Sequence, residues 1–380
     1  MTTLELRNVV KKFKDNLVLD DVSLKVENGE TLVLFGPSGA GKTVLLRLVA
    51  GVVDPDAGDI LIGGKSMKDV EPEERGLGMA FQNFALFPHM TAFDNIASPL
   101  QASHSALDKI ASGVQSVAKL LKIDHVLSHR PRALSNGQKQ RTALARALAG
   151  SPSLLLLDDP LRNVDAKLRF EMRLELPRLL EMQGATVVYV TQDYKEAMAL
   201  GDRIAVMSDK GISQIGTPEE IYLAPANTGI ARLFGDPTIN LLEVVPEHDS
   251  DGVFVRISGA RVALSPSYAA AASKECILGI RPEAFIFVAK SAKGAIPVTI
   301  EAETPLNEKI VSLASTERHR EILISRPAGT SAPSHGIAHI SVQADHALLF
   351  DRASGNRLPR AAAAFGKPAT KSKPRAGARK

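Results

Sequence analysis

Residues 31–43 read Thr-Leu-Val-Leu-Phe-Gly-Pro-Ser-Gly-Ala-Gly-Lys-Thr, an apolar run followed by a complete G-x-x-x-x-G-K-[ST] phosphate loop. The apolar run predicts a buried strand, and residues 44–53 predict the helix that follows the loop. A strand, a glycine-rich turn and a helix in this order direct backbone N–H groups toward a bound anion. The loop residues expected around the phosphates are Gly36, Pro37, Ser38, Gly39, Ala40 and Gly41. Lys42 is expected to reach the β- and γ-phosphates, and Thr43 to hold Mg²⁺.

A second apolar run, Leu154–Leu157, ends in Asp158 and Asp159. It predicts a central parallel strand that brings both carboxylates beside the phosphate loop. Asp158 is the candidate Mg²⁺ ligand, and Asp159 lies where a base would orient the attacking water. Without the phosphate loop, both acids would be better explained as a solvated strand end. Together the two runs predict Mg²⁺-dependent nucleotide chemistry on an α/β fold.

Three further motifs accompany these runs. Residues 134–138 read Leu-Ser-Asn-Gly-Gln and precede a helical pattern over residues 139–148. Gln82 lies within residues 79–90, and Phe13 within residues 10–14. In this order the motifs resemble the ATPase subunit of ATP-binding cassette (ABC) transporters, more narrowly the carbohydrate importers of the maltose and glycerol-phosphate type. The resemblance is close over roughly the first 235 residues and looser over most of the remainder.

The resemblance implies ATP as the nucleotide and assigns a role to each motif. Phe13 falls where the family stacks an aromatic side chain on adenine, and Asp165 falls in the D-loop. Gln82 matches the Q-loop glutamine, which we expect to contact both the nucleotide and Mg²⁺ and to act in catalysis. The signature sequence acts across a head-to-tail dimer, on the nucleotide held by the facing subunit. Its residues in this chain are Ser135, Asn136, Gly137 and Gln138.

The chain departs from the family pattern at three of these positions. Asp159 replaces the family's catalytic Glu. Its shorter side chain would hold the carboxylate roughly 1.5 Å back from the attacking water, and a misplacement of about 1 Å can lower a rate 100-fold. Gln192 replaces a His; it can donate a hydrogen bond but cannot carry a proton or a positive charge. Asn136 replaces a Gly, while Ser135 and Gly137 are retained. We therefore expect Asp159, Gln192 and Gln82 to form a weakened catalytic set.

These departures favour a heterodimer in which this subunit holds a weakened site and its signature completes the site of a fully equipped second ATPase. A slow homodimer and a structural ATP-binding subunit that rarely hydrolyses remain open. A soluble cassette protein acting on ribosomes or DNA predicts a second phosphate loop or long coiled-coil insertions, which the sequence lacks. The other expected partners are a membrane permease, contacted through residues 84–99, and indirectly a periplasmic solute-binding protein. The resemblance points to a sugar, a polyol such as glycerol, or glycerol phosphate, without ranking them.

The chain is long enough for two domains, because single cores seldom exceed about 250–300 residues. We expect an ABC ATPase domain over residues 1–235, with a helical lobe at about 92–150. Residues 236–355 show short strand-like runs between turn residues, typical of a small β-barrel or sandwich. Within them, Leu278–Glu283 resembles the oligonucleotide-binding (OB)-like regulatory and dimerisation domain of carbohydrate-importer ATPases. That fold name does not imply nucleic acid.

The net charge of +4 comes from the end of the chain. Residues 356–380 hold eight basic residues and no acid, which leaves the rest at about −4. This segment has few apolar side chains to bury, so we expect a disordered, solvated tail. Contact with anionic lipid headgroups or stray affinity for nucleic acid are the less favoured alternatives. The single Cys276 and the start of the chain, which has no signal-like leader, favour the reducing cytosol. No segment is expected to span a membrane, so we expect a peripheral protein at the cytoplasmic face of the inner membrane.

Overall fold

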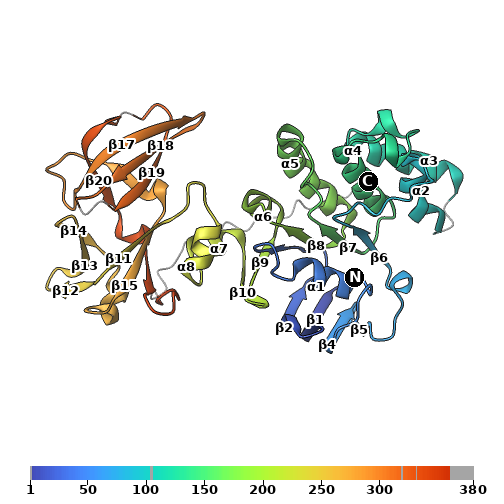
Figure 1. Cartoon of the computed structure of the whole chain (residues 1–380), viewed down its shortest axis with the longest axis horizontal. Helices are drawn as coiled ribbons and strands as arrows, with labels where there is room; N and C mark the ends of the chain where they lie inside the picture. Colours follow the sequence, from blue (N-terminus) through green and yellow to red (C-terminus); the bar gives the residue numbers. More distant parts are fainter. Residues whose placement is uncertain (1, 103–105, 318–319, 331, 360–380) are drawn as a thin grey trace, which may run out of the picture. The chain divides into compact units, whose positions relative to one another are not determined.

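The structure is a computed structural model that describes residues 2–102, 106–317, 320–330 and 332–359. It divides into two compact units, Met1–Ala226 and Asn227–Lys380. Within the described part of the first unit, strands form two sheets (Figure 1). One is antiparallel, in the order β2-β1-β4-β5: Leu4–Phe13 (β1), Asn16–Val26 (β2), Ala57–Ile62 (β4) and Lys65–Ser66 (β5).

The central sheet is mostly parallel and has the order β10-β9-β3-β8-β7-β6. Its strands are Thr31–Phe35 (β3), Leu77–Ala80 (β6), Leu154–Asp158 (β7), Thr186–Thr191 (β8), Arg203–Ser208 (β9) and Gly211–Gly216 (β10). Every residue of β3, β7 and β8 is buried. Such complete burial suits continuous apolar runs rather than alternating ones. The α/β fold expected for this part of the chain is confirmed.

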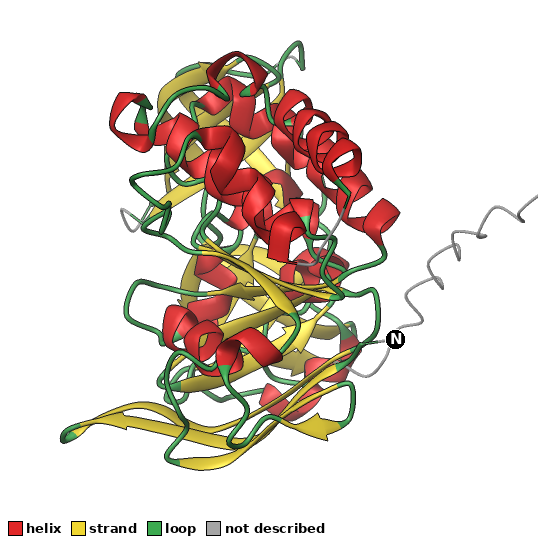
Figure 2. Cartoon of the chain, turned by 90° about the vertical axis from the view of Figure 1, so that its right-hand side faces the viewer, coloured by secondary structure: helices red, strands yellow, loops and turns green. Residues whose placement is uncertain are grey.

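Helices of the first unit cover the sheet and form a separate lobe. Their bounds are Lys42–Val49 (α1), Ala92–Ala102 (α2), Leu107–Leu120 (α3), Asn136–Ala149 (α4), Ala166–Gln183 (α5), Tyr194–Leu200 (α6) and Pro218–Leu223 (α7). Helices α2 and α3 pack against α4, in the upper part of Figure 2. Helix α1 ends before the residue 53 expected from sequence, because Gly51 adopts a left-handed φ of 77°. Within the described ranges, no helix is both long and apolar enough to cross a membrane.

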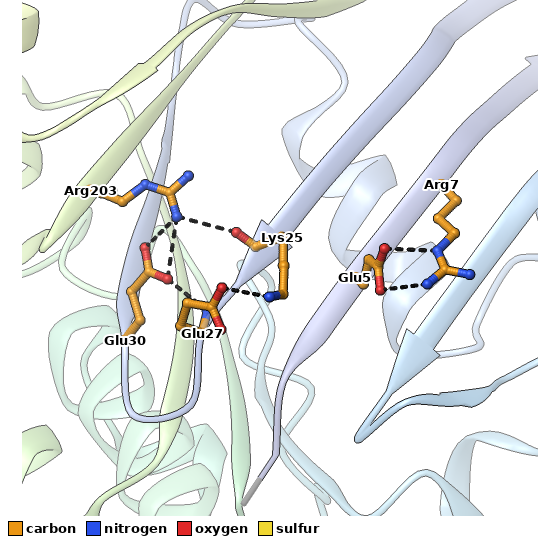
Figure 3. Close-up of polar contacts among 6 residues, drawn as sticks. All are labelled: Glu5, Arg7, Lys25, Glu27, Glu30 and Arg203. Carbon is orange, nitrogen blue, oxygen red and sulfur yellow. Dashed lines mark hydrogen bonds and ion pairs between the residues drawn. The ribbon is translucent and has the colours of Figure 1, made fainter.

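Charged residues join the two sheets where β3 begins (Figure 3). Arg203, at the start of β9, donates to the Glu30 carboxylate at 3.0 Å and to the Lys25 carbonyl of β2 at 3.3 Å. The same carboxylate accepts the backbone N–H of Glu27 at 2.7 Å. Glu30 is largely buried, unlike an exposed surface pair, so these contacts hold the turn that leads into β3. The phosphate loop at the other end of β3 thus extends from a fixed strand.

The second unit is built mainly from short strands. These are Asn240–Val244 (β11), Glu247–Asp249 (β12), Gly252–Ile257 (β13), Ala260–Ala263 (β14), Cys276–Ile280 (β15), Phe285–Phe287 (β16), Ile296–Leu306 (β17), Lys309–Ser315 (β18), Glu321–Pro327 (β19), Gly336–Val342 (β20) and Ala347–Asp351 (β21). They pair as sheets β16-β20-β17-β18-β19, β11-β15-β21 and β12-β13-β14. Their apolar faces share one core, which includes Leu278 and Ile340. The expected small all-β domain is confirmed.

Helix α8 (Thr228–Leu233) belongs to this second unit, so the division of the structure lies before it. Ala231 of α8 packs with Phe350 of β21. Buried Arg281 donates to the carbonyls of Ala231, at 2.9 Å, and Phe234. Arg281 lies within the sequence Leu278–Glu283 that carried the resemblance for this domain, and its buried guanidinium fixes the end of α8. The expected tail lies, from residue 360 onward, outside the described residues.

Candidate nucleotide site

Four adjacent strands of the central sheet, β3, β8, β7 and β6, end at the same edge and surround a cavity of about 200 Å³. Loops at the carboxyl ends of parallel strands form the usual ligand site of an open α/β sheet. The cavity is lined by Val18, Ser38, Gly39, Ala40, Gly41, Lys42, Thr43, Val44, Gln82, Asp158, Asp159, Arg162, Val190 and Gln192. The structure therefore brings together most of the phosphate loop, Gln82, both acids and Gln192.

The phosphate loop requires glycine at two close approaches. Gly41 has a left-handed φ of 91°, and a Cβ there would lie 2.7 Å from the side chain of Leu19. A Cβ on Gly36 would lie 2.4 Å from the carbonyl oxygen of Met207 in β9. The loop is consequently pressed against the first sheet on one side and against β9 on the other. Backbone N–H groups of such a glycine-rich turn suit a phosphate cradle.

Lys42 opens helix α1 and is buried. Its ammonium donates to the carbonyls of Gly36 and Pro37 at 2.7 Å each, so the side chain folds back along the loop. Burial lowers the pKa of Lys42, and the nearby carboxylates of Asp159 and Asp158 oppose that shift. Lys42 thus lies among the residues that line the cavity, close to both carboxylates.

Asp158 and Thr43 form the oxygen pair expected for Mg²⁺. The Thr43 hydroxyl donates to Asp158 Oδ1 at 3.1 Å, and Asp158 is buried. Burial raises the pKa of Asp158, and the Thr43 hydrogen bond opposes this most strongly. The described residues hold no cluster of three or more His, Cys, Asp or Glu. One carboxylate and one hydroxyl fit Mg²⁺, which keeps waters and substrate phosphates as its other ligands and would neutralise phosphate charge.

Asp159 follows β7 on a tightly held turn. Its φ of 51° is left-handed, which aspartate tolerates better than most residues. Its N–H donates to the Val190 carbonyl of β8 at 3.0 Å. Gln140 of α4 donates to the Asp159 carbonyl at 2.6 Å and accepts the N–H of Asn163 at 2.8 Å. Gln140 is buried, so its amide clamps both ends of this turn.

The carboxylate of Asp159 is buried beside Arg162, whose guanidinium lies 3.8 Å away. Burial raises the pKa of Asp159, and Arg162 opposes this more than any other charge. Gln192, directly after β8, is exposed and lines the same cavity. The sequence interpretation missed Arg162. Its only signal was a basic residue three positions after Asp159, and the turn is what places it in the cavity.

Two expected parts of the site lie elsewhere in this chain. Phe13, at the end of β1, is 45% exposed, lies under the Lys11 ammonium and is outside the residues that line the cavity. The signature residues are also outside that set. Ser135 caps α4: it accepts the Gln138 N–H at 3.3 Å, and the Gln138 side chain accepts the Ser135 N–H at 2.9 Å. Ser135 and Asn136 are exposed, as a surface that acts on a second subunit requires. Their roles stay predictions.

Comparison with known proteins matches the two units of the structure to two different family models. The family model described as "ABC transporter" matches residues 19–162, and that of the "MalK OB fold domain" matches residues 235–285. The chain is 38% identical over 359 residues to the sn-glycerol-3-phosphate import ATP-binding protein UgpC of Ruegeria pomeroyi, which covers 94% of this chain and 99% of that protein. It is 42% identical over 295 residues to the trehalose/maltose import ATP-binding protein MalK of Thermococcus litoralis, covering 74% and 78%. One chain of a solved dimer of the ATP-binding cassette MJ0796, bound to ADP and phosphate, superposes on this chain with a TM-score of 0.53 at 30% identity, over 57% of this chain and 98% of that one.

Proposed function

Because this chain belongs to the ABC transporter ATPases of the sugar and glycerol-phosphate importer branch, we propose that it couples ATP hydrolysis to import of a sugar, a polyol such as glycerol, or glycerol phosphate. We further propose that it is the subunit with the weakened site in an ATPase heterodimer. The carrying observation is that Asp159 and Gln192 line one cavity with Lys42, while Ser135 lies on the surface. Two of the three departures from the family pattern, Asp159 and Gln192, thus line the cavity for this chain's own nucleotide, while the third, Asn136, lies in the signature.

The signature end of the subunit supports the second half of this proposal. Helix α4 begins with a complete capping box, which fixes its first turn, and Ser135 and Asn136 at this end are exposed. Such a terminus stabilises negative charge. In this proposal the chain contributes a signature that retains Ser135 and Gly137 to the partner's site. The partner's signature, in turn, faces a nucleotide beside the weakened residues Asp159 and Gln192. A slow homodimer would place the weakened residues in both sites.

A second cavity supports the permease as a partner. It measures about 650 Å³, and Phe81, Phe87, Pro99 and Arg146 are among its lining residues. Arg146 of α4 donates to the Ala85 carbonyl at 2.8 Å and lies 5.4 Å over the ring of Phe87, which is 43% exposed. An apolar groove with a fixed wall suits a short helix laid into it. Docking a permease there would keep this subunit peripheral, at the cytoplasmic face of the inner membrane.

The two units have separate roles in this proposal. The first unit, Met1–Ala226, supplies the Mg²⁺-dependent ATPase, and the β-rich second unit dimerises and regulates the subunit. The periplasmic solute-binding protein acts only through the permease. No specific nucleic acid is involved.

The test is reconstitution with the cognate permease and any second ATPase encoded beside it. Native mass spectrometry gives the subunit ratio, and ATP turnover is measured with and without the solute-loaded binding protein. We expect one copy each of two different ATPases and little turnover by this chain alone. Two copies of this chain with rapid turnover would contradict the heterodimer, and turnover that ignores loaded binding protein would contradict the importer.

A further inference from the structure

Arg162 lies in the nucleotide cavity on the turn between β7 and α5. Its guanidinium is 3.8 Å from the Asp159 carboxylate, and its side chain is 54% exposed. At that distance the two form an ion pair but not a hydrogen bond, so Asp159 leaves the guanidinium N–H donors available. An exposed arginine that already points into a phosphate-binding cavity has the charge and the freedom to bind an anion there.

Hydrogen bonds hold the backbone of Arg162, whereas its half-exposed side chain makes the longer ion pair with Asp159. Its N–H donates to the Asp159 carbonyl at 3.3 Å, and its carbonyl accepts from Arg169 of α5 at 3.1 Å. Gln140 clamps the residues on either side. A residue with a fixed backbone and a half-exposed, loosely paired side chain can turn onto a ligand at little cost in backbone order.

The charges of the cavity leave a need for this cation. Of the described residues that line it, Lys42 and Arg162 are the basic ones, against the acids Asp158 and Asp159. The ammonium of Lys42 is engaged by two loop carbonyls, and Gln192 supplies no positive charge. A guanidinium, in contrast, can bind two phosphate oxygens at once.

We propose that Arg162 contacts the terminal phosphate of bound ATP, in place of the cationic side chain that Gln192 cannot provide, and thereby distinguishes ATP from ADP. The inference rests on the proposed function only in that this cavity must be the ATP site. Arg162 acts on its own chain's nucleotide and exchanges its ion pair with Asp159 for the phosphate. That exchange also frees the Asp159 carboxylate to face the water.

The test compares a non-hydrolysable ATP analogue with ADP. The full chain has no tryptophan, so affinities are measured with fluorescently labelled nucleotides in the presence of Mg²⁺. Arg162→Gln should weaken the ATP analogue about tenfold and leave ADP within twofold, since a charge-assisted contact at a half-exposed site lies at the low end of its range. Arg162→Lys keeps the charge and should lose less. Arg178→Gln is the matched control: Arg178 is an exposed arginine of α5 that does not line the cavity, so both affinities should stay unchanged.

Each outcome decides the matter. An Arg162→Gln protein that keeps its preference for the ATP analogue overturns the proposal, whether or not its turnover falls. A fall in kcat with that preference intact means that Arg162 only positions Asp159. Equal weakening of both nucleotides places Arg162 on the phosphates that they share and also overturns the proposal. Lys42→Ala distinguishes failure of the Arg162 proposal from failure of the proposed function. If that variant still binds nucleotide tightly, the cavity is not the ATP site and the proposed function itself fails.

Discussion

Replacing Asp159 by Glu and Gln192 by His should raise ATP hydrolysis by the isolated subunit. Two backbone contacts fix Asp159, to Val190 and to Gln140, so the backbone cannot absorb an added methylene. The carboxylate then advances into the cavity by roughly one C–C bond, about 1.5 Å. Since about 1 Å of misplacement can lower a rate 100-fold, recovering part of it should raise kcat at least about tenfold, near 1.4 kcal/mol of barrier.

The structure also predicts a penalty in stability. Asp159 has a left-handed φ of 51°, a conformation that glutamate tolerates less well than aspartate. The Asp159→Glu chain should lose up to about 1 kcal/mol, or roughly 2–4 °C in Tm for a unit of this size. Asp209→Glu is a matched control, because Asp209 is an exposed aspartate with a φ of 48° outside the cavity. It should show a similar loss of Tm and no change in turnover.

The assay is initial-rate ATP hydrolysis by the full chain at saturating Mg²⁺ and ATP, for both single variants and the double. Because Asp159 and Gln192 line the same cavity, we expect the double variant to exceed the product of the two single effects. Wild-type turnover near 10 per second that the double variant leaves unchanged would refute the reasoning. An ordinary homodimeric ATPase would then be the better account.

Three further outcomes are expected. Lys42→Ala should abolish tight ATP binding in a titration with labelled nucleotide, because it removes the ammonium at the floor of the cavity. Ser135→Ala should barely change this chain's own ATP affinity but should depress hydrolysis in the reconstituted complex tenfold or more; equal losses in both assays would contradict a role across the interface. Arg261 holds the pKa of Asp249 at about 2, so their pair stabilises the chain above pH 4 and ceases to as pH falls toward 2. Urea midpoints of Asp249→Asn should therefore lie below wild type at pH 5 and converge with it on acidification.

Local sequence was enough to predict the elements around the phosphates. Short continuous apolar runs that end in glycine or aspartate suit strands buried on both faces, so β3 and β7 could be predicted from the local sequence. The parallel order then predicted that the groups at their carboxyl ends lie together. The predicted end of α1 at residue 53 was wrong: the helix ends at Val49, because the left-handed Gly51 stops it while the apolar pattern continues. Helix boundaries depend on such single residues.

Contacts between distant segments could not be predicted. The sequence pattern indicated only a polar position of an amphipathic helix at Gln140. In the structure Gln140 is buried and donates a hydrogen bond to Asp159, 19 residues later in the chain. From sequence, Arg162 was only a residue of the D-loop motif. It lines the cavity because the left-handed turn at Asp159 directs it there, and nothing in the sequence indicated that turn. Both depend on the packing of α4 against the carboxyl end of β7, which the period of a sequence does not encode.

The amide of Gln140 has a consequence for cooperativity. It bonds the helix that begins with the signature to the turn that carries Asp159, and loss of either buried hydrogen bond costs about 1–3 kcal/mol. In a head-to-tail dimer of the proposed kind, one end of α4 would face the partner's ATP while Gln140 holds the Asp159 turn beside this chain's own nucleotide cavity. Movement of α4 at one nucleotide would then reach the other through this amide. Such a coupling would be reciprocal: each ATP would change the affinity of the other by the same factor, and the two sites would not fill independently.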